Sequence, residues 1–334
     1  MKEHGLDMAG VGNVSGSPRR GQPGAGSWKP GGIHPMKRPA LHKIGEALEL
    51  YTMVAPAYMV FLVFIFIPVG WAFYLSFFDY SILSLTAPRF TGLRNYVHVV
   101  NDPVFRVALW NTIRYTVYTV APRIVLGLAF ALLLDQRHLV GKNVFRACYF
   151  LPVVTSMVAA SIVWSLVLNA SPNGLANQFL AMFGAAPKGW LADSRLAMPS
   201  VCVMSVWKDL GYVMTIYIAG LQGVPMELYE AGAVDGVTTW QRIRYITIPL
   251  LRPTTFFILV TEILGSFQVF TQTYVMTEGG PGYSTTTVIN LLYNKGFKEF
   301  DMGYASGLAV ILFLGLMVLS WALRRMFRAD EIVY

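Results

Sequence analysis

The 334-residue chain has few charged residues and few cysteines. Only 13% of its residues are Asp, Glu, Lys or Arg, whereas a soluble domain carries about 25%. With 55% hydrophobic residues and a mean hydropathy of +0.51, the composition excludes an ordinary globular protein and favours a membrane protein. Its two cysteines, Cys148 and Cys202, lie in apolar runs, which excludes a disulfide scaffold and a zinc finger.

Motifs for common chemistries are also absent. The sequence contains no G-x-x-x-x-G-K-[ST] phosphate loop, no H-E-x-x-H and no G-x-S-x-G. We therefore expect no enzymatic activity and no metal or other cofactor bound by this chain. The histidines all lie outside the long apolar segments, which argues against a histidine proton relay through a membrane; they are His4, His34, His42, His98 and His138.

Long apolar segments dominate the chain after residue 50. Each is near or above the roughly 20 residues that a helix needs to cross a hydrocarbon core, and backbone groups in lipid must be bonded internally. The sequence therefore predicts an all-α membrane protein with a disordered basic tail over 1–49 and a permease domain over 50–334. The six predicted transmembrane helices are 51–78, 113–134, 147–168, 199–220, 253–276 and 304–323.

The placement of basic residues predicts the orientation. With both termini in the cytoplasm, 16 of the 26 Lys and Arg residues lie on the cytoplasmic side and 7 lie on the opposite side. This asymmetry follows the positive-inside rule. It also explains the net charge of +8 without a nucleic-acid partner.

The predicted cytoplasmic loop 221–252 has helical texture interrupted by turn residues. Pro225 suits a helix entry and Gly236 suits a helix end. Thr238 or Thr239 suits the cap of a second short helix, and Pro249 is expected to end that helix before the next span. The pattern predicts helix, turn and helix, which is either a docking element or simply a structured loop.

Polar residues inside the fourth and fifth spans predict a translocation pathway. Charged groups at membrane depth usually face a cavity or a partner because they are costly in lipid. Helical spacing and similar depth bring the two sets together near the bilayer midplane, where transporter sites usually lie. The predicted pathway residues are Ser205, Lys208, Asp209, Tyr212, Glu262, Ser266 and Gln268.

The alternative for these charges is mutual pairing, for example Lys208 or Arg123 with Glu262, which would only hold the helices together. If they line a pathway, aromatic rings beside hydroxyls and amides suit a sugar. A neutral oligosaccharide is favoured because Asp209 and Glu262 balance the two cations. An anionic sugar or a sugar phosphate such as glycerol-3-phosphate is the alternative.

The stretch 230–249 resembles the EAA motif of binding-protein-dependent ABC importer permeases. The family pattern is E-A-A, three residues, G, nine residues and I-x-L-P. This chain departs from it at Gly232, where the family has alanine, and at Ile248, where it has leucine. The resemblance assigns coupling to an ATPase to Glu230, Ala231, Gly232, Asp235, Gly236 and Pro249, with Glu230 pairing either with the ATPase or with Arg244 in the loop.

Other segments resemble the maltose and glycerol-3-phosphate permease branch, and the likeness covers roughly residues 50–328. They are FTGLRNY at 90–96, DPVFRVALWNT at 102–112, VWKDLGY at 206–212, IAGLQGVP at 218–225 and TEGGPGYSTTT at 277–287. The resemblance implies a multi-pass subunit of a sugar importer in the lipid of the bacterial plasma (inner) membrane. Its implied partners are a second related permease, two copies of an ATPase subunit that hold ATP and Mg, and an extracytoplasmic sugar-binding protein.

Two other classes of protein are alternatives to an importer subunit. A self-sufficient secondary transporter would carry duplicated halves with broken helices or coupling carboxylates, and no duplicated half is visible in the sequence. An intramembrane enzyme would need a catalytic set at one depth; Asp209 and Glu262 have no accompanying motif.

Overall fold

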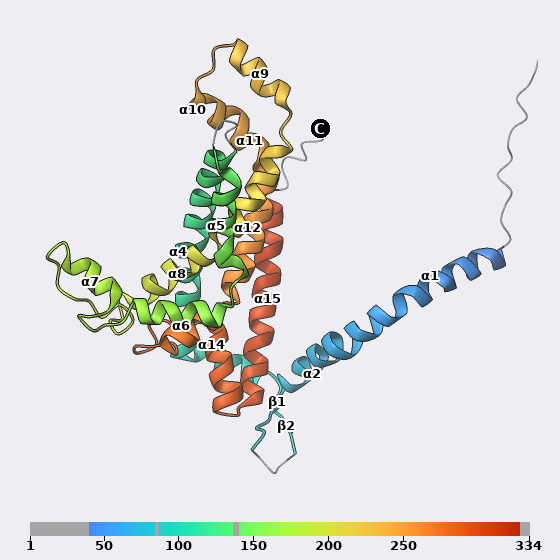
Figure 1. The fold of residues 1–334 in the computed structure, drawn as a ribbon. Coiled ribbons are helices and arrows are strands. Elements are labelled where there is room, and N and C mark those ends of the chain that lie inside the picture. Colours follow the sequence, from blue (N-terminus) through green and yellow to red (C-terminus); the bar gives the residue numbers. More distant parts are fainter. Residues whose placement is uncertain (1–39, 84–86, 136–139, 328–334) are drawn as a thin grey trace, which may run out of the picture. The chain divides into compact units, whose positions relative to one another are not determined.

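A computed structural model describes residues 40–83, 87–135 and 140–327, with side chains described between residues 51 and 326 of these ranges (Figure 1). The chain divides into two units, one up to Met59 and the other from Val60 onward. Helix α1 (Ala40–Phe61) accounts for the described part of the first unit. Residues 1–39 of the predicted tail lie outside the described residues, and the predicted boundary at 49/50 falls inside α1.

The second unit is a bundle of helices with a single two-stranded hairpin in its described part. In chain order its elements are η1 (Leu62–Phe66), α2 (Ile67–Leu75), β1 (Phe78–Asp79), β2 (Arg89–Phe90), α3 (Arg94–Asn101), α4 (Pro103–Leu134), α5 (Lys142–Val154), α6 (Met157–Val167), α7 (Leu175–Ala181), α8 (Ala197–Gln222), α9 (Met226–Val234), α10 (Thr239–Arg242), η2 (Ile243–Thr247), α11 (Ile248–Leu250), α12 (Arg252–Phe267), α13 (Thr271–Thr277), α14 (Val288–Tyr293), η3 (Asn294–Lys298) and α15 (Met302–Phe327).

The all-α membrane architecture is confirmed, and two spans are broken. Among the described residues, four helices are long and apolar enough to cross a membrane, or six if each bent pair counts as one span. The bent pairs are Lys142–Val154 with Met157–Val167 and Thr239–Leu250 with Arg252–Phe267, the second bent by 65°. The predicted span 147–168 is corrected to α5 and α6, which meet at 99°. The predicted span 253–276 is corrected to α12, which ends at Phe267, and the separate helix α13. The second span starts at Pro103 rather than at residue 113.

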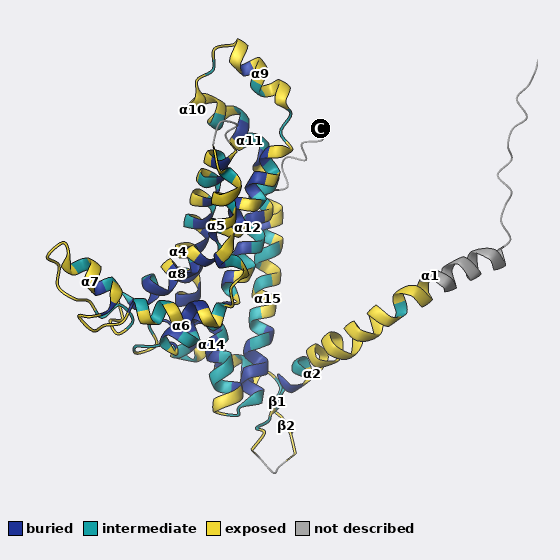
Figure 2. Ribbon diagram, in the orientation of Figure 1, coloured by how far each residue is buried: buried dark blue, intermediate teal, exposed yellow. Residues whose placement is uncertain are grey.

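Helix α8 is the centre of the bundle and packs on α4, α5 and α12. Glycines let the backbones approach at these crossings. A Cβ on Gly127 of α4 would lie 2.6 Å from Cγ1 of Val213 in α8, and a Cβ on Gly220 of α8 would lie 2.7 Å from Oγ1 of Thr254 in α12. Side chains from α4, α8 and α12 form one buried core cluster, and Figure 2 shows α8 as largely buried.

Two prolines lie just after wider, π-helical turns. Pro68 follows η1 and Pro249 follows η2. A proline ring in an α-helix clashes with the carbonyl four residues earlier and removes a backbone donor; here those carbonyls belong to Phe64 and Tyr245, inside the π turns. The expectation that Pro249 ends its helix is therefore wrong. The helix continues to Leu250 and breaks at Leu251 instead.

Candidate functional site

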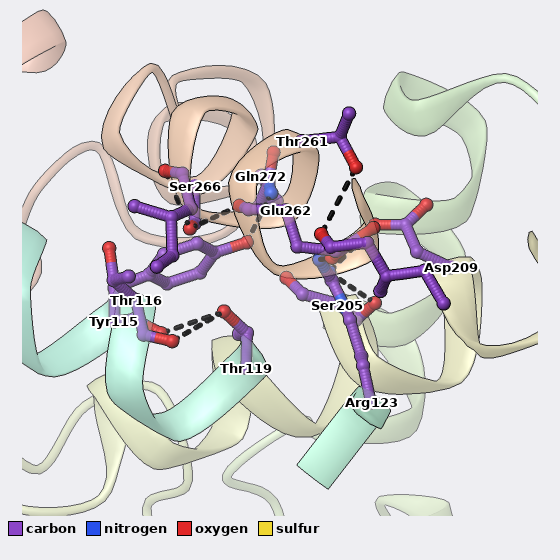
Figure 3. A network of polar contacts seen from close by, with 12 residues as sticks. Tyr115, Thr116, Thr119, Arg123, Ser205, Asp209, Thr261, Glu262, Ser266 and Gln272 are labelled. Carbon is purple, nitrogen blue, oxygen red and sulfur yellow. Dashed lines mark hydrogen bonds and ion pairs between the residues drawn. The ribbon is translucent and has the colours of Figure 1, made fainter. Parts of the chain in front are cut away.

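A buried arginine joins three helices in the middle of the bundle. In Figure 3, Arg123 of α4 lies between Asp209 of α8 and Glu262 of α12. Its Nη1 atom is 2.7 Å from Oε2 of Glu262, and its Nη2 atom is 2.7 Å from Oδ2 of Asp209 and from the carbonyl oxygen of Ser205. Arg123 and Glu262 are buried, whereas the Asp209 side chain is 27% exposed. We call Arg123, Asp209 and Glu262 the ion triad.

The ion triad forms part of the wall of a cavity of about 340 Å³. This volume is at the lower end of the range for small-molecule sites, about 300–1,000 Å³. The cavity lies where α5 gives way to α6 and where α12 gives way to α13, because lining residues come from both breaks. The lining residues are Tyr115, Arg123, Met157, Asp209, Thr261, Glu262, Gly265, Ser266, Gln268, Val269, Phe270, Thr271 and Gln272.

The formal charge of the cavity wall is negative. Its charged lining residues are one arginine and two carboxylates, and both terminal nitrogens of the arginine are bound to protein oxygens. Removing the arginine or a carboxylate from a buried ion pair leaves the other charge uncompensated, which costs about 3–5 kcal/mol. The wall therefore offers acceptors, hydroxyls and amides to a ligand. Both terminal nitrogens of the guanidinium are already engaged, and its buried Nε atom has no hydrogen-bond partner among the residues that the structure describes.

The structure brings some of the predicted pathway residues together and separates others. Asp209, Glu262, Ser266 and Gln268 line the cavity. The three remaining residues do not. The Ser205 hydroxyl bonds to the Val201 carbonyl, Lys208 donates to the Val153 carbonyl, and Tyr212 is 39% exposed.

The pairing that the sequence left open is present for Arg123 with Glu262. Within the described residues Lys208 has no such pairing. It lies beside Asp209 in sequence, but adjacent residues of a helix project about 100° apart. Asp209 faces Arg123, and Lys208 faces α5.

Tyr115 and Gln272 are cavity residues that the predicted pathway omitted. The Nε2 atom of Gln272 in α13 donates to the Tyr115 hydroxyl of α4 at 2.6 Å. A signal for Tyr115 exists in the sequence, because polar residues recur every four positions along the second span and so share one helix face. They are Asn111, Tyr115, Thr119 and Arg123. Gln272 lies after the break between α12 and α13, and no residue pattern in the sequence predicts that break.

The loop 221–252 has the predicted helix, turn and helix. Pro225 precedes α9, whose C-cap is Asp235, and Gly236 follows with φ +72°. That left-handed conformation is one that glycine adopts readily. Thr238 caps α10 through a reciprocal capping box with Gln241.

The first three residues of the EAA-like stretch, which lie in α9, differ in burial. Glu230 and Ala231 are exposed, whereas Gly232 is buried, and a Cβ there would lie 3.0 Å from Cδ1 of Ile246. In the described part of the chain Glu230 makes no ion pair with Arg244, whose guanidinium lies 6.0 Å from the Tyr245 ring centroid. The side of α9 that carries Gly232 therefore packs on η2, and Glu230 is accessible.

Large apolar side chains are also exposed along this loop. Val234 is 89% exposed, and Trp240 and Tyr245 are about equally exposed at 68% and 69%. Figure 2 shows α9 and α10 mainly as exposed ribbon. Exposed apolar groups rimmed by polar ones mark interaction surfaces.

The opposite end of the bundle is joined by hydrogen bonds between distant segments, and we call it the threonine-rich end (residues 95–112 and 269–304). The Nδ2 atom of Asn111 donates to the carbonyls of Tyr283 and Thr286 at 2.7 and 3.0 Å. The Tyr304 hydroxyl donates to Oδ2 of Asp102, the residue that caps α4. Two of the sequence segments noted above, 102–112 and 277–287, thus meet at one end, away from α9 (Figure 1).

Comparisons with known proteins agree with this architecture. Residues 123–329 match the family described as "Binding-protein-dependent transport system inner membrane component". The arabinooligosaccharides transport system permease protein AraP of Bacillus subtilis is 32% identical over 87% of this chain and 94% of its own length. The trehalose/maltose transport system permease protein MalF of Thermococcus litoralis is 34% identical over 84% of this chain and 93% of its own.

Solved structures show the same fold. A chain of a bacterial ABC transporter that imports the acidic polysaccharide alginate superposes with a TM-score of 0.77 at 21% identity, over 87% of this chain and 99% of that one. A second alginate transporter structure, in complex with a periplasmic protein bound to an alginate pentasaccharide, gives 0.74 at 22% identity, over 86% and 96%.

The fold, the loop and the matched family together define a permease subunit, a multi-pass protein of the bacterial inner membrane. The chain belongs to the binding-protein-dependent transport system inner membrane components.

Proposed function

We propose that this subunit forms half of the pathway of an ATP-driven importer for a neutral sugar. A neutral substrate is favoured because Arg123 already forms ion pairs with Asp209 and Glu262. The charged residues in the wall sum to −1, so an anionic sugar would meet repulsion without a free cation to bind it. Tyr115, Gln268 and Gln272 supply hydroxyl and amide groups that suit sugar hydroxyls.

Relatives support the substrate class. The two curated relatives described above are named for arabinooligosaccharides and for trehalose and maltose, which are uncharged. The alginate transporter takes an acidic polysaccharide, but its identity to this chain is low. A neutral oligosaccharide thus fits both the wall charge and these two relatives.

The energy source in this proposal lies outside the chain. Two copies of an ATPase subunit hold ATP and Mg and hydrolyse the nucleotide, and this chain is not itself an enzyme. The accessible Glu230 and the exposed Val234 and Trp240 support α9–α10 as the element that docks on the ATPase. A second related permease completes the pathway, and an extracytoplasmic binding protein delivers the sugar at the other face.

Closing of the ATPase pair would move the docked loops, and the spans would shift as rigid bodies around the cavity. In this arrangement α9 lies in the cytoplasm, as do both termini. Cysteines introduced at Gln222 and Gly282, both exposed, test this orientation. An impermeant thiol reagent added outside should label position 282 only, and labelling of position 222 from outside would contradict the proposal.

Uptake by the assembled importer in proteoliposomes, with its cognate binding protein, tests the substrate class. We expect neutral di- and oligosaccharides to be transported and glycerol-3-phosphate and uronic acids to be excluded. Glu262→Gln keeps an acceptor for Arg123 but removes one negative charge, and should weaken the exclusion. Thr261→Val, one residue away in the same wall, keeps the charge and serves as the control. Efficient uptake of an anionic sugar by the unaltered protein would overturn the proposal.

A further inference from the structure

Lys208 is a buried ammonium that neither the ion triad nor the cavity explains. Its residue is 5% exposed, in the middle of α8. The acidic residue next to it, Asp209, is paired with Arg123 instead. The Nζ atom of Lys208 donates to the Val153 carbonyl at 3.0 Å. A charged side chain at this depth is costly unless it has a partner. The partner of Lys208 is the Val153 carbonyl, and the position of Val153 in its helix explains the contact.

Val153 belongs to the last turn of α5. The last four carbonyls of a helix have no partner within it, and in a membrane each needs a donor from elsewhere. Thr155 satisfies the Pro152 carbonyl through its amide at 3.2 Å and its hydroxyl at 2.7 Å. Lys208 satisfies Val153, and a cation is favoured at this end of a helix by the helix dipole.

A second contact one turn away fixes the same two helices. Gly211 lies three residues after Lys208 and therefore on the same side of α8. A Cβ on Gly211 would lie 2.1 Å from the Tyr149 carbonyl oxygen. Tyr149 and Val153 are four residues apart on α5, so α8 meets the backbone of α5 at two successive turns.

This contact lies immediately before the break in the span. Thr155 and Ser156 are extended, with ψ of 152° and 134°, and α6 leaves at 99° to α5. Met157, the first residue of α6, lines the cavity. Helix α6 then packs on α13, which carries the lining residue Gln272. The direction of α6 therefore sets the position of one cavity wall.

We infer that Lys208 is a positioning residue whose ammonium anchors the end of α5 and fixes the α5–α6 bend that forms this wall. Lys208 does not touch the substrate. The inference rests on the proposed function only for its transport readout, because the geometry of the bend can be measured on its own.

The test compares Lys208→Met, which removes all three donors at similar length, with Lys208→Arg, which keeps donors and charge. Spin labels at Val144 and Leu166, exposed positions on α5 and α6, report the bend in protein without Cys148 and Cys202. Lys208→Met should broaden the interlabel distance distribution and lower transport kcat/KM by about tenfold or more, because small displacements in a binding site have effects of that order. Lys208→Arg should keep both near wild type, and the exposed Lys188→Met is the control.

An unchanged distance distribution in Lys208→Met would overturn the inference. Loss of transport in both Lys208 variants, with the bend unchanged, would instead assign Lys208 to substrate contact. If Lys208→Met does not accumulate in the membrane, Lys208→Gln is measured in the same way, and a wild-type distribution there also overturns the inference. If the unaltered importer moves no sugar, the proposed function fails while the distance measurement still tests the bend.

Discussion

The two ends of the bundle are built in different ways. At the threonine-rich end, Asn111 and Thr112 join segments that are 175 and 176 residues apart in sequence through buried hydrogen bonds with the Thr286 carbonyl and the Val288 amide. At the loop end, α9 and α10 are held by local caps and by a few contacts with η2, such as Tyr229 with Thr247 at 3.2 Å. The first end is joined by buried hydrogen bonds across the chain, although Ser284 Oγ, Asn290 Nδ2 and Asn294 Oδ1 there have no partner within the described part of the chain. The second leaves large apolar side chains exposed. The fold therefore separates a hydrogen-bonded platform from an exposed surface, which in the proposed function is completed by the ATPase.

The largest effect is expected from Asn111→Ala at the threonine-rich end. The change removes the donors to two carbonyls, and an unsatisfied buried group costs about 1–3 kcal/mol. Thermal unfolding of the purified subunit should therefore show a clear loss of stability. Asn173→Ala, at an exposed loop position, should leave the unfolding curve unchanged. Equal stability of the two variants would contradict the view of this end as a platform.

A smaller and local effect is expected from Gly236→Ala. Alanine at φ +72° costs about 1–2 kcal/mol, and the strain falls on the turn between α9 and α10. The subunit should unfold at its usual temperature but recover less ATPase in a pull-down. Gly223→Ala is the matched control, since Gly223 has φ −81° in the same region. A Gly236→Ala subunit that binds ATPase at wild-type yield would show that the turn geometry is not needed for docking.

The smallest effect on the subunit itself is expected from Val234→Ser. Val234 is 89% exposed, and such surface changes usually alter stability by no more than about 0.5 kcal/mol. Its effect should appear only on assembly, as weaker binding of the ATPase. Val140→Ser changes a valine that is 91% exposed outside the loop and should bind ATPase normally. If both variants bind equally well, the apolar face of the loop is not the docking surface.

The sequence predicted those parts of the fold that depend on local pattern. Apolar length located the spans, and Pro225, Gly236 and Thr238 located the ends of the loop helices. The break after Val154 was not predicted because Thr155 and Ser156 are ordinary residues in an apolar run. Pro249 was misjudged because a widened turn before a proline has no sequence signature in this chain.

The candidate site was predicted only in part, for a related reason. Charged residues at membrane depth are visible in any sequence, so Arg123, Asp209 and Glu262 could be singled out. Which of them pair depends on how α4, α8 and α12 pack, and that is set by long-range contacts. The sequence grouped Lys208 with Asp209 because of their position, and the structure turns them toward different helices.

The ion triad also has a consequence for the order in which the protein is made. Arg123 is synthesised 86 residues before Asp209 and 139 residues before Glu262. Until those partners enter the membrane, α4 carries an unpaired cation at a cost of about 2.5–3.5 kcal/mol on insertion scales. A chain interrupted before α12 lacks Glu262, so Arg123 keeps part of this cost. An incomplete subunit therefore differs from a finished one by an incompletely paired arginine in its transmembrane region.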